Sequence, residues 1–179
     1  AMEEKALEIR RRALGSDHEQ FTICLRNLGV AYLQQGMHAK ALARLEEGLG
    51  ITRRIHPERH SIEGRFLASI GSVYREQGEL DEALGLQKKA LRIYRKTVGP
   101  ESLEVAGALR QMSGIFKSQG KYEKAIEKYE ESLAIYRGVH GNEHDQVAAT
   151  LYALALCKEK AGDGGEASEC VREAHRIYA

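Results

Sequence analysis

Apolar positions recur with helical spacing in two kinds of segment that alternate along the chain. The first kind, at about residues 20–35, carries a stripe at i, i+3, i+4 and i+7 that consists of Leu25, Leu28, Gly29 and Tyr32. The second kind, at about residues 39–54, has an inward face made of Ala41, Leu42, Leu45, Leu49 and Thr52. Gly36 lies between them, and glycine commonly ends a helix in the left-handed conformation. The pattern predicts a helical hairpin.

This hairpin pattern returns every 42 residues without gaps. The glycines that separate the two helices are Gly36, Gly78, Gly120 and Gly162, and the leucine stripe repeats at Leu25, Leu67, Leu109 and Leu151. Polar linkers join the hairpins, and we expect serine or aspartate near the N-cap of most first helices. Small residues at the Gly29 and Ala41 registers are expected where the two helices of a hairpin approach each other.

The period sets the expected organisation of the chain. The predicted segments are 1–17 (the second helix of a preceding repeat and its linker), 18–59, 60–101, 102–143 and 144–179, the last truncated at its end. Because one hairpin cannot bury its own stripe, we expect stacked antiparallel helix pairs, an all-α solenoid. Ala1 precedes Met2, and the sequence stops inside a helical pattern at Ala179. We therefore expect a piece of a longer protein.

The composition limits the cellular locations to be considered but points to no catalytic or metal-binding chemistry. The chain is 42% hydrophobic and 30% charged, as folded proteins are, and its net charge of +1 gives no overall attraction to nucleic acid or an anionic membrane. No apolar run approaches the roughly 20 residues that cross a bilayer, and the first residues do not form a signal peptide. The three cysteines lack the spacing of a metal site or a disulfide framework. We predict a cytoplasmic, intracellular protein.

The repeated residues resemble the tetratricopeptide repeat. Its Leu-Gly-x-x-Tyr pattern, followed by glycine and alanine, is matched by Leu28, Gly29, Tyr32, Gly36 and Ala41. The 42-residue period and the loops Gly15-Ser16-Asp17-His18 and Gly141-Asn142-Glu143-His144 are similar to the repeats of kinesin light chains. The resemblance implies a right-handed superhelix that acts as a protein–protein interaction module or scaffold. Lys158 departs from the pattern at the aromatic position of repeat four, which we interpret as a polar outer face near the end of the array.

The resemblance also implies where a partner binds. Helical geometry places a second face of each first helix opposite the apolar stripe, and in this family that face lines a concave groove. The candidate groove residues are Ile23, Arg26, Asn27, Val30, Leu33, Arg65, Ser69, Ser72, Arg75, Arg110, Gln111, Lys117, Tyr152 and Lys160. Six basic residues outnumber two acidic ones, Glu76 and Glu159, at these registers. We predict that a partner's peptide or helix binds there, acidic and with an apolar anchor, although charges on a helix face also serve solvation alone.

Other motifs favour no chemistry. His56 and His60, like His140 and His144, have the i, i+4 spacing of helical metal ligands, but both pairs fall in linkers, so no metal site is predicted. No nucleophile, acid–base pair or phosphate loop is visible, so we expect no enzyme, no cofactor and no nucleic-acid or membrane partner. Two alternatives stay open. The chain could be a regulatory or autoinhibitory segment of a larger signalling protein, such as an NTPase switch, and it could self-associate through exposed repeat ends.

Overall fold

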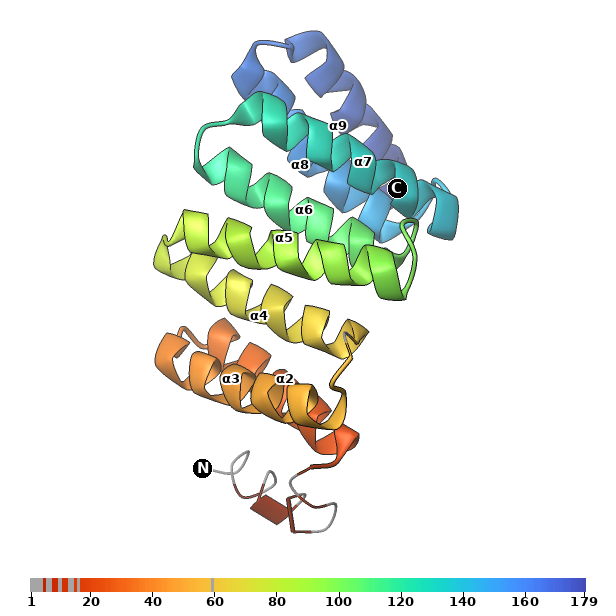
Figure 1. The fold of residues 1–179 in the computed structure, drawn as a ribbon. Helices are drawn as coiled ribbons and strands as arrows, with labels where there is room; N and C mark the ends of the chain where they lie inside the picture. The colour runs from red at the N-terminus through yellow and green to blue at the C-terminus, as the bar shows by residue number, and fades with distance from the viewer. Residues whose placement is uncertain (1–4, 6–7, 10, 13–14, 16, 59) are drawn as a thin grey trace. The chain divides into compact units, whose positions relative to one another are not determined.

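The computed structural model describes residues 5, 8–9, 11–12, 15, 17–58 and 60–179. Within this part of the chain the complete helices are α2 (Glu19–Gln34), α3 (His38–Ile55), α4 (Ser61–Gln77), α5 (Leu80–Thr97), α6 (Leu103–Ser118), α7 (Tyr122–His140), α8 (Asp145–Ala161) and α9 (Gly164–Tyr178), and no strand occurs there. The residues divide into two compact units, Ala1–Ile93 and Tyr94–Ala179, and each is described by itself. The predicted all-α class is confirmed (Figure 1).

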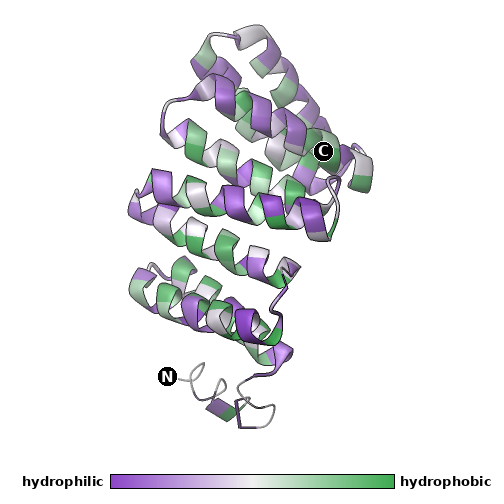
Figure 2. Cartoon of the chain, in the orientation of Figure 1, coloured by the Kyte–Doolittle hydropathy of each residue, from purple (hydrophilic) through white to green (hydrophobic). Residues whose placement is uncertain are grey.

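Successive helices pair as the period predicts. In the first unit α2 packs on α3, and α4 contacts both of them. In the second unit α6 packs on α7, α7 on α8, and α8 on α9. Figure 2 shows hydrophobic positions alternating with hydrophilic ones along these helices, which is the stripe read from the sequence. Each hairpin therefore buries its apolar face against a neighbouring helix.

The four first helices end in the same hydrogen-bonded turn. In repeat one the N–H of Met37 donates to the carbonyl of Tyr32 at 2.8 Å, and the N–H of Gly36 donates to Leu33 at 2.9 Å. This pair of bonds is the Schellman motif, which needs a left-handed residue after the helix. Gly36, Gly78, Gly120 and Gly162 supply it with φ of 71°, 84°, 71° and 97°. The predicted glycine stops are confirmed.

Two glycines of the first unit allow close helix contacts. A Cβ on Gly29 of α2 would lie 2.6 Å from Leu45 Cγ and 3.3 Å from the Ala41 carbonyl, both on α3. The predicted close approach at this register is therefore confirmed. Gly48 of α3 lies under the ring of Phe66 from α4, and a Cβ there would overlap that ring. Phe66 is fully buried, so the missing side chain of Gly48 forms the hole that this aromatic knob fills.

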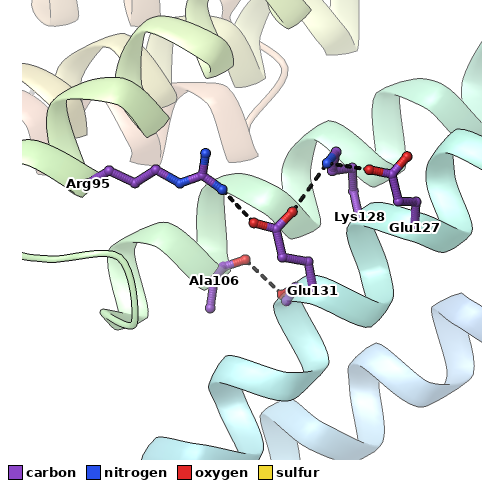
Figure 3. Close-up of polar contacts among 6 residues, drawn as sticks. Arg95, Ala106, Glu127, Lys128 and Glu131 are labelled. Carbon is purple, nitrogen blue, oxygen red and sulfur yellow. Dashed lines mark hydrogen bonds and ion pairs between the residues drawn. The ribbon is translucent and has the colours of Figure 1, made fainter.

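In the second unit, polar contacts tie α7 to its neighbours (Figure 3). The buried Ser132 hydroxyl donates to the carbonyl of Ala106 on α6 at 2.8 Å. Glu131 accepts from Arg95, at the end of α5, and from Lys128, which also reaches Glu127. The three charged contacts lie at the surface, where an ion pair is worth about 0–1 kcal/mol. The buried hydroxyl bond is therefore the contact that costs more to lose.

The N-caps of the first helices overturn one expectation. Histidine, rather than serine or aspartate, caps three of the four. The Nδ1 atoms of His18, His60 and His144 accept from the backbone N–H two residues later at 3.1, 3.3 and 3.0 Å. Only Ser102 fits the prediction, accepting from Val105 N–H at 3.4 Å. An unprotonated imidazole nitrogen carries an in-plane lone pair, so it replaces the usual side-chain oxygen as acceptor.

The helix predicted ahead of repeat one falls largely outside the described residues. Leu7 and Ile9 stand 42 residues before Leu49 and Ile51 of α3, and Leu7 lies outside the described residues. Ile9 is helical, as are Lys5, Glu8, Arg11 and Arg12, and the Ile9 side chain is 67% exposed. The extra half repeat and the repeat boundaries stay predictions.

Candidate peptide-binding surfaces

In the first unit, α2 carries five candidate groove residues that differ in exposure. Ile23 is 42% exposed, and Asn27 is also exposed. Arg26 is half-buried and donates to Asn27 Oδ1 at 3.2 Å, which holds its guanidinium along the helix. Val30 and Leu33 are half-buried. The apolar candidates of repeat one, Ile23, Val30 and Leu33, are therefore only partly accessible, and Ile23 is the most exposed of them.

The candidates on α4 are mostly satisfied within their own helix. The Ser69 side chain is buried, and its hydroxyl donates to the Arg65 carbonyl at 2.9 Å. Ser72 donates to the Ala68 carbonyl at 3.1 Å. Arg75 forms an ion pair with Glu76 at 2.8 Å, so its charge is partly balanced, whereas Arg65 is exposed. Of this set, Arg65 is best placed to meet a partner.

In the second unit, α6 presents Arg110, Gln111 and Lys117, all half-buried. The Arg110 Nε atom is enclosed and has no hydrogen-bond partner. Burial raises the pKa of the Cys157 thiol on α8, and the charge of Lys117 lowers it less strongly. The use of these α6 residues in a groove stays a prediction.

Tyr152, the first candidate position on α8, lies in an aromatic cluster with α9. Its ring meets His175 edge-on at 5.5 Å between centroids and stacks on Tyr178 at 6.2 Å. Lys160, the last residue but one of α8, is exposed.

Tyr152 also borders an open pocket of about 600 Å³ between α8 and α9. Its lining consists of Tyr152, Ala155, Leu156, Glu159, Gly164, Ala167, Ser168, Val171 and Arg172. Leu156 is 53% exposed, so an apolar group entering the pocket would cover apolar surface now in contact with water. The sequence prediction had assigned only the α8 half to a surface. The α9 half was missed, although Ala167 belongs to the alanine register that marks the inner side of every second helix.

Lys158 contradicts the expectation of a polar outer face in repeat four. Its side chain is 10% exposed and forms ion pairs with Glu130 of α7 at 2.9 Å and with Glu166 of α9. The hydrogen bond that Lys158 Nζ donates to Glu166 is the main reason that the pKa of Lys158 is raised. The sequence does not single this position out, because the matching registers hold Lys88 and Lys124 around Phe116 but Glu46 and Glu82 around Tyr74. Carboxylates at these registers accompany an aromatic residue in repeat two and a lysine in repeat four.

The cysteines and histidines do not form a reactive or metal-binding group in the part of the chain that is described. Burial raises the pKa values of Cys157 and Cys170, which disfavours the nucleophilic thiolate. No cluster of three or more His, Cys, Asp or Glu side chains able to hold a metal ion is found among the described residues. The same residues include no helix that is both long and apolar enough to span a membrane.

The comparisons with known proteins agree with the repeat geometry. The family description "tetratricopeptide repeat" matches residues 4–54, 65–138 and 104–179, which together cover most of the chain. The chain belongs to the tetratricopeptide repeat family. No curated protein matches it. The tetratricopeptide repeat fold generally mediates protein–protein interactions, and its members are generally non-enzymatic scaffolds.

Several solved structures are similar to this chain, among them kinesin-light-chain proteins. BtubC (BKLC) from P. vanneervenii superposes with a TM-score of 0.84 at 22% identity, over 98% of this chain and 70% of that one. A kinesin-light-chain protein of nearly identical TPR-like repeats from Podosopora anserina gives 0.75 at 22% identity, over 98% and 82%. MamA gives 0.66 at 18% identity, over 97% and 85%. At these identities the likeness supports the fold.

Proposed function

We propose that this tetratricopeptide repeat chain holds a peptide or helix of a partner protein, with an apolar anchor of the partner seated in the pocket between α8 and α9. The observation that carries the proposal is the open, mostly apolar pocket lined by Tyr152, Leu156 and Val171. A volume of about 600 Å³ is large enough for one or two side chains of a peptide. Tyr152 offers a rigid aromatic surface of the kind enriched in interfaces.

The basic residues at the predicted groove positions favour an acidic partner. Arg110 and Lys117 on α6 and Lys160 on α8 supply positive charge from the face predicted to form the groove, against Glu159 at the pocket edge. An arginine guanidinium binds a carboxylate through two parallel hydrogen bonds, which suits Arg110 to a glutamate or aspartate of the partner. In the first unit, Ile23 and Arg65 offer the matching pair of an apolar and a basic side chain.

The test uses fluorescent peptides that share one central leucine and differ in their flanks, either glutamate or lysine. The expected result is tighter binding of the glutamate peptides, measured by fluorescence polarisation at two salt concentrations. Leu156→Asp should abolish binding of both sets, because it places a charge in the pocket. Val139→Asp is the matched control, since Val139 is similarly exposed at 49% but lies on α7 outside the pocket.

The charge preference has its own variant pair. Arg110→Glu should weaken binding of the glutamate peptides by about tenfold, the loss of one good charged contact. Lys124→Glu makes the same charge change at an exposed site on α7 and should leave binding unchanged. If neither peptide set binds, or if Leu156→Asp binds as well as the unmodified chain, the proposal is wrong. Self-association through the same face would appear as a concentration-dependent mass.

A further inference from the structure

Two pairs of stacked imidazole rings lie at junctions between repeats. His56, which follows α3, stacks on His60 with ring centroids 4.4 Å apart and planes 10° from parallel. His140, the last residue of α7, stacks on His144 at 3.8 Å and 8°. In both pairs the second histidine is the N-cap of the next first helix. Each pair therefore joins the end of one repeat to the start of the next.

The capping contact requires an unprotonated ring nitrogen. Nδ1 of His60 accepts from the Ile62 N–H and Nδ1 of His144 accepts from the Gln146 N–H. Protonation places a hydrogen on that nitrogen, so the ring becomes a donor only and the helix N–H loses its acceptor. The new positive charge would also lie at the positive end of the helix dipole. Both effects oppose a charged cap.

Charged groups surround the first pair of rings. They are Glu19 from α2, Arg53 and Arg54 from α3, Asp17 and Glu58 from the loops, and Glu63 from α4. Both arginines are already paired, with Glu63 at 2.9 Å and with Asp17 at 2.6 Å. The Glu19 carboxylate lies 3.4 Å from the enclosed Nε2 of His56. The Glu19 carboxylate and the His60 ring therefore face His56 from two sides.

Charged and titratable groups also surround the second pair, His140 and His144. Its charged and titratable neighbours are Tyr136 and Arg137 from α7, Glu143 and Asp145 beside the cap, and Arg176 and Tyr178 from α9. Arg137 pairs with Glu173 at 2.7 Å and Arg176 with Glu143 at 3.4 Å. Tyr136 stacks on His140 at 6.4 Å, so the ring stack extends into α7. Because Glu143 is already paired with Arg176, it would offset little of a second positive charge in the ring stack.

The intervening junction provides the comparison within the chain. At the same registers it carries Val98 and Ser102, and the Ser102 hydroxyl caps α6. A hydroxyl does not take up a proton in the range where histidine does, so this junction has the same cap without the titration. We propose that the two histidine pairs make the junctions before α4 and α8 sensitive to acid, while the junction before α6 is not. Acid loosens the first turns of α4 and α8 by removing their caps.

The main test is amide hydrogen exchange of the whole chain at about pH 7.5 and about pH 5.5, with each protection factor corrected for the intrinsic rate. Protection at the Ile62 and Gln146 amides should fall about fivefold at the lower pH, as loss of one cap implies. Protection at Val105 should stay the same. Equal changes at all three amides, or no change at Ile62 and Gln146, would overturn the proposal.

Two sets of variants separate this from general acid destabilisation. His60→Ser with His144→Ser copies the native cap of α6, so it should fold at pH 7.5 and lose the pH dependence at Ile62 and Gln146. The reverse change, Val98→His with Ser102→His, should create a new pH-dependent amide at Glu104. The Tm difference between the two pH values should shrink by about 5 °C in the serine variant. An unchanged Tm difference, or a Glu104 amide insensitive to pH, would contradict the inference.

Discussion

Repeats three and four place different side chains in one buried position at the end of the first helix. Phe116 of α6 and Lys158 of α8 are 42 residues apart, and their exposures are 9% and 8%. Their backbones make the same contact. The Phe116 carbonyl accepts the Schellman hydrogen bond from the Lys121 N–H at 2.9 Å, and the Lys158 carbonyl accepts it from the Asp163 N–H at 2.8 Å. Only the side-chain chemistry differs. Repeat three buries an aromatic ring, and repeat four buries a charge.

The difference teaches that the position requires a long buried side chain and that aromatic character is one of two solutions. A buried ammonium needs compensating charges, and Glu130 and Glu166 supply them from the two second helices beside α8. The lysine is therefore joined to two partners that the phenylalanine does not need. The carboxylates alone do not dictate the lysine, since Glu46 and Glu82 hold the same registers relative to Tyr74 in repeat two.

The largest effect should come from moving the charge without its partners. Phe116→Lys loses the buried ring and introduces an ammonium whose matching registers hold lysines, Lys88 and Lys124. We expect a loss of about 3–5 kcal/mol in the free energy of unfolding, measured by urea denaturation. Ser118→Lys, an exposed site two residues later, is the control and should change stability by less than about 0.5 kcal/mol. A small loss for Phe116→Lys would mean that the aromatic ring is dispensable.

A smaller effect is expected at alkaline pH. The Glu166 hydrogen bond, and next the Glu130 contacts, raise the pKa of Lys158 above its ordinary value of 10.5. Because the folded value is the higher one, this stabilisation is complete below pH 10.5 and is lost as the pH rises beyond it. The slope for this one proton is at most about 1.4 kcal/mol per pH unit. Urea midpoints at increasing pH should fall more steeply for the unmodified chain than for Lys158→Met, and parallel curves would refute the effect.

The smallest effect should come from giving repeat four the solution of repeat three. Lys158→Phe removes the ion pairs but fills the same volume, and the Glu130 and Glu166 side chains are 52% and 66% exposed, so water still solvates their charges. We expect a change of less than about 1 kcal/mol at neutral pH by calorimetry. Lys158→Ala removes the ion pairs and also leaves a cavity, so it should lower the free energy of unfolding more than Lys158→Phe does. The reverse order would show that the ion pairs, rather than the packing, hold this position.

Much of the fold could be predicted because the repeat period samples each register four times. The stripe around Leu25 and Tyr32 and the glycine stops rest on steric rules that act within one helix, so the sequence alone reveals them. The family then adds the pairing of the helices. Repetition makes these local rules visible, because a pattern seen once could arise by chance and the same pattern at one step could not.

What could not be predicted depends on groups distant in sequence. The burial of Lys158 follows from carboxylates 28 residues before it and 8 after it, on two other helices. Gln87 is another example, since it occupies the register of Leu45 but is 1% exposed, with its amide donating to the Ala68 carbonyl at 3.0 Å. The α9 half of the pocket was missed for the same reason. The period reveals the positions that all repeats share, but it does not reveal positions such as 158 and 87, where one repeat uses a different residue.

The contact of Gly48 with Phe66 has a consequence for how such an array can evolve. The residues at the register of Gly48 in later repeats are Ala90, Ser132 and Ala174, each with a Cβ, and those at the register of Phe66 are Ala108 and Thr150. Only Gly48 provides the space that Phe66 requires. A gene rearrangement that placed repeat two after a copy of itself would drive the ring into Ala90. The repeats therefore share a shape but are not interchangeable, and their order in the chain is itself inherited information.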